Sequence, residues 1–400
     1  MRIQAGRISV VVFISIAFLV SCGSEEFSSP RGKSAQENLS LPTRFEAILS
    51  ISDPMERTRE WLVFLDSLQP SDAQQVGEQF GESVGRLDEA AAILIGSWWT
   101  EVDPLAALHA GAGWHWDGKR LGIRIVLRRW AALDPRAAFG ILQEMPLKNE
   151  QDLQNAAGAL ATGFFEADPV PDRSELGRVL GTLTPLSDPK SRHVAFDALI
   201  AGMITRWGLD ESQRFVDGMS AGPQANIHRD FSLRFVSQFA GIDPKRAVAW
   251  LDGVAPGETG TNLRRRLGAR WARFDGPAAM KWASGQPASK DRDMIMEHTY
   301  RNFVSSDETA AVEWMHERVN DTALTPALPM FLARLSRSQP EQAAEWVSLV
   351  EDPKGRRIAA LNVARAWLRA DESAARDWLP ESGLSPRDRA SVLARLNAPN

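Results

Sequence analysis

The most regular feature of the chain is a recurring arrangement of apolar and polar positions. Each copy has an aromatic or other large apolar residue, an Asp four positions later, usually a Pro close behind, two small residues and then a Trp. One copy reads Trp271-Ala-Arg-Phe-Asp275-Gly-Pro-Ala-Ala-Met-Lys-Trp282. The small residues and the Trp fall three, four and seven positions after the Asp, a spacing that puts them on one face of a helix. Each copy therefore predicts an amphipathic helix.

The Asp in each copy is predicted to cap the helix that follows it. Its side chain can accept hydrogen bonds from the free N–H groups of the first turn, where Pro is tolerated because no N–H is needed. The predicted caps are Asp103, Asp134, Asp243, Asp275, Asp307 and Asp371. Positions 243, 275, 307, 339 and 371 follow one another at intervals of 32 residues, with Gln at 339. Asp168 and Asp210 are expected to hold the same place in looser copies.

A second, longer apolar-periodic stretch follows each of these helices after a helix-breaking residue such as Gly253, Gly285 or Pro353. Each unit is thus expected to be a short helix, a loop and a longer helix. Neither helix can bury its apolar face alone, whereas stacked neighbours can. The residues predicted to anchor this core are Trp130, Trp250, Trp271, Trp282, Trp314, Trp346, Trp367 and Trp378. The pattern predicts an all-α fold of stacked helical hairpins with a period of about 32 residues.

This repeat resembles the α-solenoids of the tetratricopeptide, Sel1 and HEAT type, and it is most similar to the Trp/Asp-Pro helical repeats of bacterial envelope proteins. It differs from tetratricopeptide repeats in its period and lacks their Trp-x-x-Leu-Gly-x-x-Tyr signature. The resemblance implies a right-handed α-solenoid over residues 98–380, and it implies no activity. We expect a helical cap at 42–97 and a C-terminal capping helix at 381–400. A domain break near 184–190 remains an alternative to one continuous array.

The N-terminal segment is typical of an export signal. Arg2 and Arg7 precede an apolar run at residues 8–20 that is too short to cross a hydrocarbon core of ~30 Å. Its end, Leu19-Val20-Ser21-Cys22-Gly23, resembles the lipobox of bacterial lipoproteins. The resemblance implies a signal peptide at 1–21 that is removed and a diacylated thiol on Cys22. An ordinary signal peptide that ends in a chance Cys is the alternative.

A lipid on Cys22 has consequences for location. Two or more acyl chains give stable membrane anchoring, and the Ser-, Glu-, Gly- and Pro-rich stretch at 22–41 is expected to be a flexible tether. Position 23 is Gly, so the Asp of an inner-membrane retention signal is missing. By that resemblance we expect the bacterial outer membrane, with the folded part in the periplasm or at the cell surface. Cys22 is the only Cys, which excludes a disulfide within the chain.

Composition and charge limit the classes of partner that the chain is expected to bind. The chain is 44% apolar and 24% charged, as soluble globular proteins are. With 46 basic and 51 acidic residues its net charge is −5, which argues against a nucleic-acid partner. Trp occurs 14 times and Tyr once, in keeping with the use of Trp as a repeat anchor.

Three motifs were considered for catalysis. Gly218-Met-Ser220-Ala-Gly222 matches a nucleophile elbow, but that motif needs a preceding strand and here follows a predicted helix. Glu82, followed by Ser, resembles the start of lytic transglycosylase motifs, but the Gly-Leu-Met-Gln segment expected downstream is missing. His109 and His115 do not have zinc-protease spacing, and a lone Cys excludes Cys-based zinc sites. We expect no metal, no cofactor and no enzymatic activity.

Two features remain as candidate binding surfaces. Trp114, His115 and Trp116 lie in a Gly-rich loop and could form a stacking platform for a sugar or peptide, or fold back onto the end cap. Arginines also recur near the ends of the longer helices: Arg128, Arg129, Arg270, Arg273, Arg301, Arg334, Arg337, Arg365 and Arg369. Complementing the helix dipole is the favoured explanation, and a basic stripe for an acidic partner is the alternative.

These observations favour a membrane-anchored scaffold that binds a protein or peptide partner in the cell envelope. A glycan- or peptidoglycan-binding module that uses the loop tryptophans is the second hypothesis. An envelope hydrolase, acting through Ser220 or Glu82, is the third.

Overall fold

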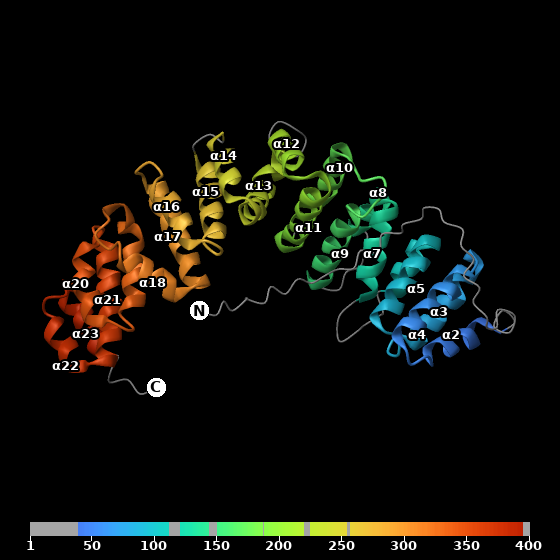
Figure 1. The fold of residues 1–400 in the computed structure, drawn as a ribbon, viewed down its shortest axis with the longest axis horizontal. Helices are drawn as coiled ribbons and strands as arrows, with labels where there is room; N and C mark the ends of the chain where they lie inside the picture. The colour runs from blue at the N-terminus through green and yellow to red at the C-terminus, as the bar shows by residue number, and fades with distance from the viewer. Residues whose placement is uncertain are drawn as a thin grey trace, which may run out of the picture.

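The computed structural model describes residues 39–111, 121–143, 150–186, 188–219, 225–253 and 257–394. Within these ranges the chain is helical throughout and contains no β-strand, which confirms the all-α prediction. The helices lie side by side along one arch, with the N-terminal helices at one end and the C-terminal helices at the other (Figure 1).

The helices come in pairs. The first helices of the pairs are α2 (Leu41–Leu49), α4 (Ala73–Ser83), α6 (Pro104–Gly111), α8 (Pro135–Gly140), α10 (Arg173–Leu183), α12 (Leu209–Met219), α14 (Pro244–Asp252), α16 (Gly276–Ser284), α18 (Glu308–His316), α20 (Pro340–Glu345) and α22 (Glu372–Trp378). The second helices are α3 (Pro54–Asp66), α5 (Glu89–Val102), α7 (Leu121–Leu133), α9 (Glu150–Phe164), α11 (Pro189–Trp207), α13 (Ala225–Ile242), α15 (Glu258–Trp271), α17 (Lys290–Ser306), α19 (Leu328–Leu335), α21 (Pro353–Ala370) and α23 (Pro386–Ala394). Short 3₁₀ turns are η1 (Pro70–Asp72), η2 (Ile141–Gln143), η3 (Thr322–Ala327) and η4 (Trp346–Leu349).

The second helices form the more continuous layer. Each of them packs against the second helix of the next pair, except that η3 takes this place between α17 and α19. In the middle of the arch, α9, α11, α13 and α15 lie on the inner side, while α10, α12 and α14 lie on the outer edge (Figure 1). The inner side of the arch is therefore a surface built from successive second helices.

The core is one continuous apolar cluster that runs through the stack. Close approach of the helices depends on small residues at their contacts. At Gly163 of α9, an added Cβ would lie 1.9 Å from the backbone oxygen of Arg128 in α7, so only Gly fits this contact. The predicted Trp anchors Trp130, Trp250, Trp271 and Trp367 are buried, and the other four are half-buried against the same cluster.

The two aromatics of one repeat copy contact each other. The ring centroids of Trp271 and Trp282 are 6.1 Å apart, and those of Trp367 and Trp378 are 5.7 Å apart. Because the first ring lies in the last turn of a second helix and the other in the last turn of the following first helix, each pair covers the joint between successive hairpins.

The repeat Asp residues lie at helix N-termini. The backbone N–H three positions later donates to Oδ1 of each of them, at 2.9 Å for Asp103 and Asp307, 3.0 Å for Asp134, Asp243 and Asp275, and 3.1 Å for Asp371. Gln339 makes no such bond, and the helix that follows it has only 6 residues.

Two of the looser copies depart from this chemistry. Asp168 is not a cap: α10 begins five residues later, and Asp172 accepts the bond from the N–H of Glu175 at 2.9 Å. Asp210 lies inside the first turn of α12, which begins at Leu209 directly after Gly208, the residue that ends α11 with a φ of 82°. The backbone N–H and the hydroxyl of Ser212 both donate to the carbonyl of Gly208, at 3.2 and 2.6 Å. The prediction for these two positions was wrong because sequence spacing alone could not choose between neighbouring polar residues.

A second set of Asp-Pro caps, which the repeat pattern did not include, begins second helices at Asp53, Asp188 and Asp352. Four residues after each cap lies an Arg, whose guanidinium donates a hydrogen bond to the backbone carbonyl six residues before that Arg. Arg57 donates to Ile51 at 2.7 Å, Arg192 to Leu186 at 3.0 Å and Arg356 to Val350 at 2.6 Å. These arginines close the connection between the two helices of a pair.

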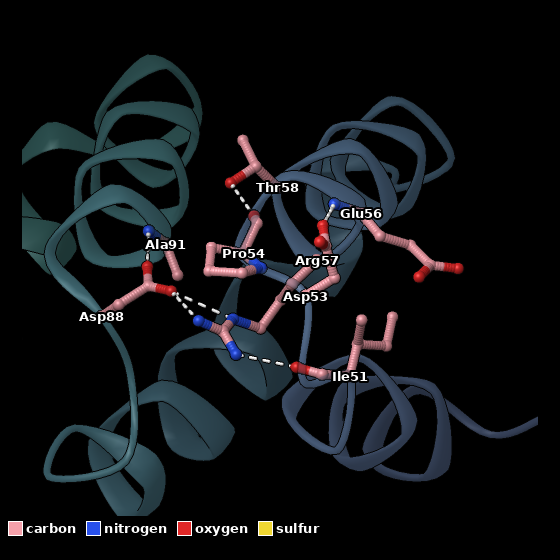
Figure 2. Close-up of polar contacts among 8 residues, drawn as sticks. All are labelled: Ile51, Asp53, Pro54, Glu56, Arg57, Thr58, Asp88 and Ala91. Atoms are coloured by element: carbon pink, nitrogen blue, oxygen red, sulfur yellow. Dashed lines mark hydrogen bonds and ion pairs between the residues drawn. The ribbon is translucent and has the colours of Figure 1, made fainter.

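At α3 the same arrangement also joins neighbouring pairs (Figure 2). Nε and Nη2 of Arg57 donate to Oδ2 of Asp88 at 3.0 and 2.7 Å, while Oδ1 of Asp88 caps α5 by accepting from Ala91 N at 2.8 Å. One carboxylate thus fixes the start of a helix and its contact to the preceding pair.

Several sequence predictions fall outside the described residues. These are the signal peptide at 1–21, Cys22, the tether up to residue 38, the loop residues Trp114, His115 and Trp116, and Ser220. The expected junction at 97/98 falls inside α5, and residues 386–394 form the terminal helix α23. None of the described helices combines the length and apolarity that a membrane span requires.

Candidate functional site: a basic cleft

A cleft of about 610 Å³ lies between α17, η3, α19 and α21. Of these elements, α17 and α21 lie towards the C-terminal end of the arch (Figure 1). This volume is in the range of ligand-binding pockets in proteins. The cleft lies where the middle helix is shortest: α19 has 8 residues, whereas α17 has 17 and α21 has 18. The turn η3 replaces the start of that helix, and Pro326 and Pro329 at this break line the cleft.

The lining of the cleft carries a surplus of positive charge. Its basic side chains are Arg301, Arg334, Arg337, Lys354, Arg365 and Arg369, and its acidic ones are Glu297 and Asp352. Five of the six basic residues belong to the arginines that the sequence analysis placed near the ends of second helices. The stack brings these five together from three successive second helices.

The repeat period explains why these arginines meet. Arg337 and Arg369 are 32 positions apart, and Arg301 and Arg365 are 64 apart. Arg301 and Arg365 accordingly lie five residues before the ends of α17 and α21, while Arg337 follows the end of the shorter α19. In α21, Ile358, Asn362, Arg365 and Arg369 all line the cleft at helical spacings of three and four residues. The cleft wall of α21 is therefore a single stripe along one helix face.

The cleft arginines differ in their partners. Arg334 and Arg337 each approach Glu308 at 3.4 Å. Arg301, Arg365, Arg369 and Lys354 form no ion pair with any residue that the structure describes. The Nε of Arg365 is buried and has no hydrogen-bond partner among those residues. Because an unsatisfied buried donor costs ~1–3 kcal/mol, this group would gain from an added acceptor.

Several arginines elsewhere in the stack form ion pairs with acids of a neighbouring pair. Arg128 pairs with Glu166 and Arg129 with Glu101. Further pairs are Arg229–Glu258 at 2.7 Å, Arg234–Asp197 at 2.5 Å and Arg357–Asp388 at 2.5 Å. Arg270 instead lies over the ring of Phe274, 4.6 Å from its centroid. The arginines near the ends of second helices thus differ in their partners, and those of the cleft include three, Arg301, Arg365 and Arg369, without an ion pair to a described residue.

The helix dipole accounts for only some of the cleft arginines. Arg334 and Arg369 lie in the last turns of α19 and α21, where a cation complements the dipole. Arg301 and Arg365 each lie five residues before the end of their helix, beyond the last turn in which this effect operates. Their presence at the cleft therefore needs another explanation.

The acidic residues mark one side of the cleft. Burial raises the pKa of the Glu297 carboxyl, and nearby Arg301 opposes this shift by lowering it. Asp352 caps α21 by accepting from the N–H of Gly355 at 2.6 Å. Asp352 and Lys354 lie at the start of α21, whereas Arg365 and Arg369 lie near its end.

The hydroxyl groups of the cleft are occupied. Tyr300, the only Tyr of the chain, is buried and donates to the carbonyl of Ala311 at 3.3 Å, and burial raises the pKa of its phenol. Ser336 donates to the carbonyl of Ala333 at 3.2 Å. No His or Cys lines the cleft in the described part of the chain. Its side chains are suited to holding an anion and do not assemble a nucleophile with a base.

The other candidates from the sequence lie apart from this cleft. Glu82 is exposed at the end of α4, where Gln79 donates to it at 3.2 Å. His109 is in the last turn of α6. No group of three or more His, Cys, Asp or Glu residues that could hold a metal occurs in the ranges that the structure describes.

Comparison with known proteins gives no relative. No family model, no curated protein and no solved structure matches the chain. The cleft and the repeat therefore have to be interpreted from the residues of this chain alone.

Proposed function

We propose that the protein is a lipid-anchored helical-repeat scaffold of the bacterial cell envelope, and that it binds a protein or peptide partner. The observation that carries the proposal is the cleft between α17, α19 and α21, because it crosses three successive layers and leaves cationic groups without internal partners. The cleft thus presents several cationic groups from successive layers to an acceptor from outside the array.

The scaffold is proposed to be a right-handed α-solenoid with a period of about 32 residues. This is supported by cap positions that recur every 32 residues from Asp243 to Asp371, and by the packing of each second helix on the next. Arrays of this kind present long surfaces on which extended segments of other proteins bind.

A protein or peptide fits the cleft better than a small polar ligand does. Ile358, 44% exposed, and Met330 give the cleft an apolar stretch beside its basic one. A peptide can satisfy both kinds of surface at once, since its side chains alternate in character while its backbone stays extended.

Photo-crosslinking tests the partner. A photoreactive amino acid at position 358 of the anchored chain should give a discrete adduct in intact cells. The matched control is position 194 in α11, since Val194 is also an exposed aliphatic residue of a second helix, 38% exposed. The same adduct at both positions, or none at 358, would contradict a partner site at the cleft.

The anchor is tested separately. The lipobox-like segment before Cys22 predicts that the chain fractionates with outer membranes and carries acyl chains on that residue. Cys22→Ser should move the protein to the soluble fraction and remove the acyl mass. A variant that stays membrane-bound would show that the anchor lies elsewhere.

A further inference from the structure

We propose that the cleft binds an extended, acidic segment of the partner, in which an apolar side chain is followed about three residues away by a carboxylate. Arg365, together with Arg301 and Arg369, is the receptor for the carboxylates, and Ile358 is the contact for the apolar side chain. This inference rests on the proposed function and names the chemistry of its partner.

The charge of the partner follows from what the stack leaves unmatched. At several places along the array, an Arg of one helix pair meets a carboxylate of a neighbouring pair, as Arg234 does with Asp197. Arg301, Arg365 and Arg369 receive no such carboxylate from the described neighbouring layers. A guanidinium group binds carboxylates through paired N–H donors, so a carboxylate from outside is the acceptor that completes the pattern.

The spacing follows from the geometry of α21. Ile358 and Arg365 are seven residues apart on one helix face, which corresponds to about 10 Å along the axis. An extended segment in the polyproline II conformation rises about 3.1 Å per residue with three residues per turn, so side chains three residues apart lie on one face and about 9 Å apart. Arg369 lies one helical turn beyond Arg365, about 6 Å further along the axis, and adds to the positive charge that faces the carboxylate.

The apolar stretch favours a peptide over other anions. Inorganic phosphate or a lipid headgroup would satisfy the arginines but would leave Ile358 and Met330 in contact with water. Glu297 reduces the positive potential near Arg301, and its partial burial raises its pKa. Exchanging this carboxylate for an amide should therefore strengthen the binding of an acidic segment.

The test uses the full anchored chain in detergent and a random library of labelled peptides. We expect selected peptides to be enriched in Glu or Asp three positions from an aliphatic residue. For a selected peptide, Arg365→Gln should weaken binding about tenfold or more, as loss of a charge-assisted hydrogen bond does. Glu297→Gln should strengthen it several-fold, a gain that a misfolded variant cannot mimic.

The control is Arg128→Gln, since Arg128 also lies near the end of a second helix but is already paired with Glu166. It should leave peptide affinity within twofold. Inorganic phosphate and phosphatidylglycerol vesicles are assayed in parallel, and competition by either at the affinity of the peptide would overturn the assignment to a peptide. A library without acidic enrichment would do the same.

These outcomes are separable from those of the proposed function. If crosslinking at position 358 captures a discrete partner but the library shows no acidic preference, the scaffold function stands and the inference fails. If acidic peptides are selected but no adduct forms in cells, the cleft chemistry stands and the cellular role fails.

Discussion

The caps of α10 give a sharp test of the fold, because two Asp residues four positions apart compete for the same role. The repeat pattern points to Asp168, whereas in the structure Asp172 accepts the hydrogen bond from Glu175 N at 2.9 Å. Replacement of a capping Asp by Ala costs ~1 kcal/mol, within a range of about 0.5–2. Asp172→Ala should therefore destabilise α10 by about that amount. Asp168→Ala, at an exposed position outside the helix, should cost less than ~0.5 kcal/mol.

Hydrogen exchange measured by mass spectrometry is the suitable assay. Repeat arrays unfold in parts, so one melting temperature would mix α10 with distant layers. A loss of ~1 kcal/mol corresponds to roughly fivefold faster exchange of amides that open locally. We expect this acceleration within residues 173–183 for Asp172→Ala and unchanged exchange in α16, which Asp275 caps. Faster exchange of α10 in Asp168→Ala than in Asp172→Ala would refute the cap assignment.

Three further predictions concern packing, acid stability and the loop tryptophans. Gly163→Ala should destabilise the protein by about 1–3 kcal/mol in urea unfolding, because the added Cβ meets the backbone of α7. Gly181 has open space around it, so Gly181→Ala should instead stabilise α10 by about 0.5–1 kcal/mol. Hydrogen bonds from the Arg357 guanidinium and the Ser385 hydroxyl lower the pKa of Asp388 from 3.8 to about 2, so the carboxylate contributes to stability above pH 3.8 and this contribution is lost as the pH falls towards 2. The difference in melting temperature between wild type and Asp388→Asn should therefore shrink over that window. A difference that does not depend on pH would contradict this. If binding resides in the cleft, Trp114→Ala combined with Trp116→Ala should leave acidic-peptide affinity unchanged, and a fluorescence titration with cell-wall fragments checks the competing glycan hypothesis.

Local chemistry made much of the fold predictable. A helix whose first turn is capped by a repeat Asp needs few distant contacts to define its start, so the sequence placed the starts of α14, α16, α18 and α22 correctly. The pattern failed at α12. Gly208, at a positive φ, ends α11, and α12 begins at the next residue, so Asp210 falls inside the first turn.

The second family of caps was missed for a different reason. Asp53, Asp188 and Asp352 are also followed by Pro, but they begin second helices and lack the aromatic that precedes the repeat Asp. The Arg four residues after each of them is the signal that could have identified the family. Its role becomes visible only when the carbonyl six residues earlier is seen to accept from it, as Ile51 does from Arg57 at 2.7 Å.

The cleft depended on information that a linear reading does not contain. The sequence shows the arginines near the ends of second helices but not the acids that they meet. In the structure they separate by partner, and that separation is set by which acids the neighbouring layer supplies. The short α19, with Pro326 and Pro329 at its beginning, adds the space that turns a basic surface into a cleft.

The unmatched arginines also bear on why the array has this form at its C-terminal end. Replacing Arg365 by Ala or Leu would remove a buried, unsatisfied donor and spare the array a cost of ~1–3 kcal/mol. The equivalent position one period earlier is Ala333, so the repeat accepts a small apolar residue at this place. Local conflicts of this kind are concentrated where a protein meets its ligand, since there stability is exchanged for binding. An Arg that weakens the free array and strengthens the bound one is expected at a recognition site, and a spacer would have no use for it.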